Sequence, residues 1–309
     1  MSAPVIRCVG LARWYGEVQG LSGLTVDVSP GVVGLLGPNG SGKTTLMRLL
    51  TGLARPTRGH AELFGTRVSP DQWAVFRRVG YAPGDDVHFE SERGSDFLAL
   101  MARVAGDGPM AARARARAAL EKVGMEELAT KKLSTMSKGM RQRIKVAQAL
   151  LLEPELLLLD EPLNGMDPVS RRKTINLVRA HGAAGGTVLF SSHILHEVES
   201  VTDRMLLLHH GRLLAEGRLS EIVGLLERKP RRVQISSGSR REIAAALLQE
   251  DYVSGVSFGD DSQLLLETRD LNRLLDRLQA YGGAGQIESM EIADENLESV
   301  FDTLVGSAV

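Results

Sequence analysis

Hydrophobic and polar residues follow two different periods along the chain, and each period marks a region. Near the start, short β-rich runs at 4–9, 24–28 and 32–36 are separated by glycines and by the triplet Ser29-Pro30-Gly31. Glycine and proline commonly end strands at turns. The pattern therefore predicts that antiparallel strands open the chain.

Further along, longer helical stretches alternate with apolar runs at 156–160, 187–191 and 205–208. This alternation is typical of an α/β fold with a largely parallel sheet. Between about 94 and 150 the β pattern stops, and Ala, Arg, Leu and Met recur at helical spacing. We expect a helical insertion over this range.

The charged, proline-containing segment 227–232 has no apolar period and is the best candidate for a linker. It predicts a larger domain at 1–227 and a smaller one at 228–309. In the smaller domain the pattern predicts strand 232–236, helix 240–250, strand 252–258, strand 263–268, helix 270–281, strand 286–292 and a last helix at about 294–304. The order βαββαβ is that of a small ferredoxin-like α+β domain.

The composition of the chain limits the classes of partner and the compartment that we expect for it. Lys and Arg number 37 against 38 Asp and Glu, for a net charge of −1, so no nucleic-acid partner is expected. At helical spacing Arg113 and Arg117 share a face while Arg115 points nearly opposite, which favours a solvated surface over a binding stripe. A single cysteine, Cys8, fits a reducing compartment. The most apolar stretch, 149–163, is broken by Glu153-Pro154-Glu155 and falls short of the roughly 20 residues of a membrane helix, so we expect a soluble chain.

The strongest chemical signal is GPNGSGKTT at 37–45, which follows an apolar strand and precedes a helical stretch. This is the context that a phosphate-binding loop requires. Gly40 and Gly42 would let backbone N–H groups face the β-phosphate. Lys43 would bridge the β- and γ-phosphates, and the Thr44 hydroxyl would hold Mg²⁺.

A second signal is the leucine run 156–159, which ends in Asp160-Glu161-Pro162. At the end of a buried strand, Asp160 can hold the Mg²⁺ shell, and Glu161 can polarise an attacking water molecule. Taken alone, the run could equally be a buried strand that meets a surface turn. Together with Lys43 it favours nucleotide hydrolysis.

A third signal begins at Met136. Ser137 and Gly139 precede the apolar face of an amphipathic helix, and a hydroxyl, a glycine amide and a helix dipole together form a second phosphate-binding device. One nucleotide does not easily need both devices of one chain. The simplest interpretation is that this end binds ATP held by another copy.

Over roughly 4–227 these motifs resemble, in order and spacing, the nucleotide-binding domain of ATP-binding-cassette (ABC) transporters. The resemblance implies a P-loop NTPase with an antiparallel β-subdomain and a helical subdomain, and ATP and Mg²⁺ as cofactors. By this resemblance, ATP is bound by Tyr15, Gly37, Pro38, Asn39, Gly40, Ser41, Gly42, Lys43, Thr44, Thr45, Ser137, Gly139 and Asp167; Mg²⁺ is bound by Thr44 and, through water, Asp160; and the catalytic residues are Glu161, His193 and Lys43. Tyr15 would stack on adenine, and His193 would touch the γ-phosphate.

Two positions depart from the family pattern. Lys138 and Met140 replace the usual glycine and glutamine of the signature, and the variant resembles the signatures of bacterial exporter subunits. Gly84 stands where the family usually has a glutamine or glutamate that contacts Mg²⁺ and the attacking water. Either Asp85 or Asp86 replaces that side chain after a small loop shift, or the role is weakened.

The C-terminal extension, with its closing segment 296–301, resembles the small domain of subunits paired with ABC-2-type permeases, which are exporters. The resemblance implies a head-to-tail homodimer on a separate transmembrane permease, at the cytoplasmic face of the membrane. One alternative is a soluble family member acting in translation or DNA repair, but such proteins commonly carry two cassettes or a long coiled-coil insertion, and neither is visible. Another alternative, compatible with the first, makes the tail a regulatory module.

Overall fold

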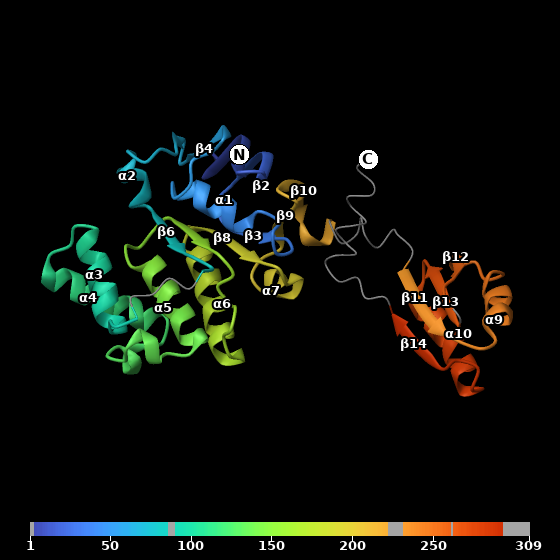
Figure 1. The fold of residues 1–309 in the computed structure, drawn as a ribbon. Helices are drawn as coiled ribbons and strands as arrows, with labels where there is room; N and C mark the ends of the chain where they lie inside the picture. Colours follow the sequence, from blue (N-terminus) through green and yellow to red (C-terminus); the bar gives the residue numbers. More distant parts are fainter. Residues whose placement is uncertain (1–2, 86–89, 222–230, 261, 293–309) are drawn as a thin grey trace. The chain divides into compact units, whose positions relative to one another are not determined.

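The computed structural model describes residues 3–85, 90–221, 231–260 and 262–292, and the chain divides into two compact units, 1–219 and 220–309 (Figure 1). The predicted boundary at 227/228 and the predicted last helix at about 294–304 lie outside the described residues. The two units are described separately.

The first sheet of the larger unit is antiparallel. It holds β1 (Ile6–Tyr15), β2 (Val18–Val28), β4 (Arg58–Leu63) and β5 (Thr66–Arg67) in the order β2-β1-β4-β5. β1 is longer than the predicted strand 4–9, because Gly10, with φ +54°, lies where the pairing register of β1 shifts, and the strand continues past it. The prediction that Gly10 lies in a turn was wrong.

The second sheet is the parallel one. Its strands are β3 (Gly31–Leu36), β6 (Val79–Ala82), β7 (Leu156–Leu159), β8 (Thr187–Ser192), β9 (Arg204–His209) and β10 (Arg212–Arg218), in the order β10-β9-β3-β8-β7-β6. Placing the run 32–36 among antiparallel strands was wrong, because β3 pairs in parallel with β8 and β9. The reason is that β3 runs directly into a helix, so the chain returns by a crossover instead of a hairpin. Only β10 pairs antiparallel in this sheet.

Helices cover both faces of the parallel sheet. On one face lies α1 (Lys43–Leu50), and on the other lie α5 (Lys138–Leu150) and α6 (Pro168–Ala183) (Figure 1). The leucines of β7 explain this sandwich, since successive side chains of a strand point to opposite faces. Leu156 and Leu158 belong to the core shared with α1, whereas Leu157 and Leu159 belong to the core shared with α5.

The predicted helical insertion is present. It consists of α3 (Gly94–Val104), α4 (Pro109–Lys122), two short 3₁₀ turns (Glu126–Leu128 and Leu133–Thr135) and α5. Of the three arginines on α4, Arg115 donates from Nε to Asp107 Oδ2 at 2.6 Å, and the other two are exposed. A four-residue helix, α2 (Trp73–Phe76), precedes β6.

The smaller unit has the element order β11 (Arg231–Ser236), α9 (Arg240–Leu247), β12 (Val253–Phe258), β13 (Gln263–Thr268), α10 (Leu271–Gly283) and β14 (Ser289–Ile292). This is the predicted βαββαβ order. The strands form an antiparallel sheet in the order β12-β13-β11-β14. Across the described part of the chain, no helix is long and apolar enough to span a membrane.

Candidate nucleotide site

The loop between β3 and α1 can be built only with glycine at key positions. Gly42 has φ +106°, and a Cβ there would lie 2.5 Å from the carbonyl oxygen of Gly20. A Cβ on Gly37 would lie 2.4 Å from the carbonyl oxygen of Leu208. At the exposed tip are Asn39 and Gly40. The chain therefore curls as tightly as a phosphate cradle requires.

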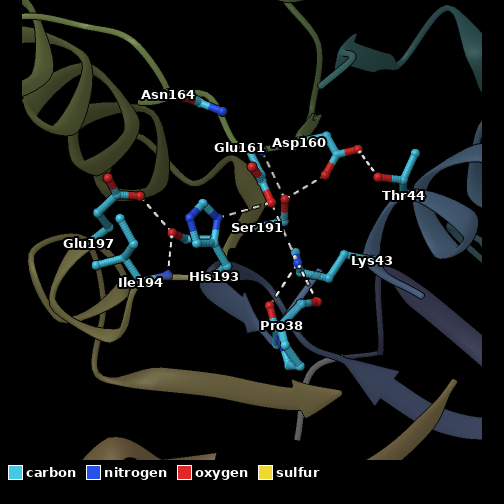
Figure 2. Close-up of polar contacts among 12 residues, drawn as sticks. Pro38, Lys43, Thr44, Asp160, Glu161, Asn164, Ser191, His193, Ile194 and Glu197 are labelled. Carbon is cyan, nitrogen blue, oxygen red and sulfur yellow. Dashed lines mark hydrogen bonds and ion pairs between the residues drawn. The ribbon is translucent and has the colours of Figure 1, made fainter. Parts of the chain in front are cut away.

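Two polar groups of this loop fit an anion. Ser41 Oγ is buried and has no hydrogen-bond partner among the described residues. Lys43, 5% exposed, donates from Nζ to the carbonyl oxygens of Gly37 at 2.7 Å and Pro38 at 3.1 Å (Figure 2). Burial lowers the pKa of Lys43, and the carboxylates of Glu161 and Asp160 oppose that shift. A buried hydroxyl without a partner and a desolvated ammonium group are both groups that a phosphate would satisfy.

Beside the loop, the end of β7, strand β8 and the first turn of α1 bring one buried carboxylate between two hydroxyls. Asp160, 1% exposed, accepts from Thr44 Oγ1 at 2.7 Å and from Ser191 Oγ at 2.6 Å (Figure 2). Carboxylate and hydroxyl oxygens are the hard ligands that Mg²⁺ prefers. The residues present thus fit the predicted metal ion.

Glu161 stands next to this carboxylate, and the predicted catalytic residues meet at it. Glu161 Oε1 lies 3.2 Å from His193 Nδ1 and 3.5 Å from Lys43 Nζ. His193 Nδ1 is buried and makes no hydrogen bond, although the two atoms are close. The predicted grouping of Glu161, His193 and Lys43 is therefore present in the geometry, as Figure 2 shows.

A buried network fixes the segment that carries His193. Ser192 Oγ donates to Glu197 Oε2 at 2.6 Å and accepts from the N–H of Ile194 at 3.0 Å (Figure 2). Arg171 of α6 lies 3.0 Å from Glu197 Oε1. Glu197 belongs to the short helix α7 (Leu195–Glu199) and is 7% exposed. The sequence analysis did not single out Glu197, since its role depends on a helix far away in the chain.

The loop that follows β6 contains Gly84, which has no side chain to offer to the neighbouring carboxylate. A Cβ on Gly84 would lie 3.3 Å from Asp160 Oδ2, so a side chain there would point at the Asp160 carboxylate. Asp85, a predicted substitute, is 60% exposed and pairs instead with Arg48 of α1. The other candidate, Asp86, lies outside the described residues. Lys145 of α5 donates to the carbonyl oxygens of Gly84 at 3.4 Å and Asp85 at 3.3 Å, from a buried position.

Tyr15 lies at the end of β1 and is 40% exposed. The guanidinium carbon of Arg13 is 4.6 Å from its ring centre. A Cβ on Gly20 would touch both the Tyr15 ring, at 3.0 Å, and Thr45 Oγ1, at 2.9 Å. The aromatic ring and the last threonine of the phosphate loop therefore lie against the same glycine.

Ser137, Gly139 and Asp167 stand apart from this cluster. Within the described residues, none of them forms a hydrogen bond or ion pair with Lys43, Thr44, Asp160 or Glu161. Ser137 caps α5 by accepting from the N–H of Met140 at 3.3 Å.

Asp167 caps α6. Its hydrogen bonds from Ser170 hold the pKa of the carboxyl below its usual value.

Known proteins that are similar to this chain also bind ATP, as the geometry of the loop and its neighbours indicates. The family model described as ABC transporter matches residues 21–164, which run from β2 to just past Glu161. The daunorubicin/doxorubicin resistance ATP-binding protein DrrA of Streptomyces peucetius is 33% identical, with 97% of this chain and 92% of that protein covered. The bacitracin transport ATP-binding protein BcrA of Enterococcus faecalis is 32% identical, with 98% of this chain and 96% of that protein covered.

Solved structures share the fold of the larger unit. The ATP-binding subunit of an ABC transporter, 30% identical, matches with a TM-score of 0.65 and covers 72% of this chain and 93% of that one. A cassette in a dimeric post-hydrolysis state with ADP and Pi, 21% identical, has a TM-score of 0.64 and covers 69% of this chain and 98% of that one. The second likeness concerns the fold alone. Family model, full-length relatives and site geometry agree: the chain belongs to the ATP-binding proteins of ABC transporters and is an ATPase.

Proposed function

We propose that the chain hydrolyses ATP with Mg²⁺ as one half of a head-to-tail homodimer and thereby drives a separate export permease. The observation that carries the proposal is the position of Glu161 Oε1, within 3.5 Å of Lys43 Nζ and 3.2 Å of His193 Nδ1. A carboxylate beside a phosphate cradle is where a base for attacking water is needed.

Each residue of the cluster has a distinct proposed task. The loop amides and Lys43 bind the β- and γ-phosphates, and the Tyr15 ring stacks on adenine. Thr44 and Asp160 hold Mg²⁺, which when bound neutralises phosphate charge. Glu161 accepts a proton from the attacking water, and His193 orients the γ-phosphate.

A second copy of the chain is the proposed binding partner of the α5 N-terminus. Ser137 and Gly139 form a phosphate-binding end, yet they make no polar contact with the cradle of their own chain among the described residues. A helix N-terminus that carries a hydroxyl able to donate a hydrogen bond attracts phosphate. ATP held by one copy would thus meet Ser137 of the other, with Asp167 at the same contact.

An apolar groove beside the Gly84 loop is the proposed contact with the permease. The groove has a volume of about 470 Å³, and its walls include Tyr81, Pro83, Asp85, Phe97 and Met101. The α3 face continues outward through Leu100 and Val104, which are 41% and 76% exposed. Exposed apolar surface next to a groove is typical of a protein interface.

Export is proposed from the relatives named for drug resistance and bacitracin transport. Docking on a permease would place the chain on the cytoplasmic face of the membrane.

Two variants test the separate roles of Lys43 in binding ATP and of Glu161 in hydrolysing it. Lys43→Ala is expected to abolish binding of a fluorescent ATP analogue, because the cradle loses its cation. Glu161→Gln is expected to bind ATP normally, to lower turnover by about a thousandfold and to accumulate as a dimer in size-exclusion chromatography with ATP. Near wild-type turnover of Glu161→Gln would remove Glu161 from the role of base.

A further inference from the structure

The backbone of Glu161 adopts an uncommon conformation. Its φ is +48°, in the left-handed region that residues with a side chain avoid. Such a conformation persists only when neighbouring groups hold it, and it is found most often at functional sites. The contacts around Glu161 therefore determine where its carboxylate points.

Both backbone polar groups of Glu161 are held by hydrogen bonds. Its N–H donates to Ser191 Oγ at 2.9 Å. Its carbonyl oxygen accepts from the N–H of Asn164 at 3.2 Å, which closes a turn, and from Nε2 of Gln142 at 3.2 Å. A carbonyl can only accept, so the –NH₂ group of Gln142 must face it.

Gln142 is buried on the face of α5 that packs against the core of the larger unit. It is 2% exposed and lies four residues before Val146 and eight before Leu150, both buried on the same face of α5. A primary amide in such a place costs free energy unless its hydrogen bonds are made. The carbonyl of Glu161 is the partner that the structure gives it.

Two further contacts join α5 to the turn that follows Glu161. Lys138 Nζ donates to Asn164 Oδ1 at 3.2 Å. A Cβ on Gly139 would lie 2.6 Å from the carbonyl oxygen of Gly165, so only glycine allows the close approach. The first turn and a half of α5 thus packs directly against Glu161 and the residues after it.

We propose that Gln142 is a positioning residue for Glu161, and that through it the N-terminal end of α5 sets the orientation of the base. The inference rests on the proposed role of Glu161. A movement of α5 on binding phosphate at Ser137 would reach Glu161 of the same chain through one hydrogen bond. The rate of hydrolysis at Glu161 of one chain would then depend on the contact between α5 of that chain and the nucleotide bound by the other copy.

A double-mutant cycle tests this in the full-length chain. Gln142→Met keeps the length of the side chain and removes the donor. We expect single-turnover hydrolysis to slow by about tenfold, with unchanged affinity for a fluorescent ATP analogue, because only the base is displaced. In the Glu161→Gln background the same change should have no further effect, since a residue that acts through the base has nothing left to act on.

The matched control is Thr187→Val, another buried polar side chain, which lies at the end of β8 away from Ser191. It should leave hydrolysis unchanged. If Gln142→Met is unstable, Gln142→Leu, which also lacks the donor, serves in the same cycle.

Wild-type turnover in the Gln142 variants, or an equal slowing with and without Glu161, would overturn the positioning role. A Glu161→Gln chain that turns over normally would instead overturn the assignment of the base, so the two failures are distinguishable.

Discussion

At the scale of single residues, Gly84 stands where the ABC resemblance predicts a glutamine or glutamate. The backbone directs a Cβ at Asp160 Oδ2, yet no side chain is present, and Asp85 is turned to Arg48. If the proposed Mg²⁺ and attacking water lie at Asp160, Gly84 offers them no side-chain contact, which should slow hydrolysis while ATP affinity is kept.

Gly84→Gln is predicted to raise basal turnover by about tenfold, because the amide would contact the metal and water. The change should also make turnover depend less on the permease. Gly84→Ala is the matched control, since it adds the Cβ without the amide and should not accelerate hydrolysis. Steady-state phosphate release measures both variants. Equal rates for the glutamine variant, the alanine variant and the wild type would leave this loop as a docking surface alone.

How much of the site could be predicted depends on whether a residue works within a motif. Lys43 and Thr44 lie in one local motif and Asp160 in another, and the structure brings the two motifs together. Gln142 and Glu197 act through partners distant in the sequence, and no local spacing marks them. For Gln142, a weaker signal was available in the sequence, because a polar residue on the apolar face of a predicted helix indicates a buried polar contact.

At the scale of elements, the close packing of β6 against α5 depends on Gly80. A Cβ there would lie 2.0 Å from the carbonyl oxygen of Ala149, which belongs to the helix backbone and cannot rotate away. Gly80→Ala is therefore predicted to destabilise the larger unit by about 1–3 kcal/mol through overpacking. Urea unfolding followed by fluorescence measures the change.

The control for this prediction is Gly108→Ala, where an added Cβ would meet no atom within 4 Å. Its cost should stay below about 1 kcal/mol, since Gly108 only caps a helix. Equal stability of the two variants would show that β6 and α5 can separate without cost.

Strands with an unbroken run of apolar residues could be predicted from the sequence, whereas strands whose apolar run is interrupted could not. The leucine run of β7 is buried on both faces, so its strand was clear from the sequence. β6 is a short edge strand with Gly80 inside it, and β4 mixes polar and apolar residues, so neither was predicted. Tertiary pairing, which local sequence does not report, decides such strands.

At the scale of the whole molecule, we propose that each complete site spans two copies of the chain. The cradle of one chain would close on the α5 N-terminus of another, and Gln142 would link that contact to the base of its own chain. Symmetric pairing of two identical chains would create two such sites. The central claim is therefore that the phosphate cradle and Ser137 act in trans.

Mixing two inactive variants tests this claim most directly. Ser137→Arg blocks the α5 end, and Lys43→Ala disables the cradle, so homodimers of either variant have no intact site. In a mixture, each heterodimer keeps one site free of both lesions. ATPase activity of the mixture should recover to about a quarter of the wild-type rate, because half of the dimers are mixed and one of their two sites works. A mixture as inactive as its components, with and without the permease, would contradict the site in trans.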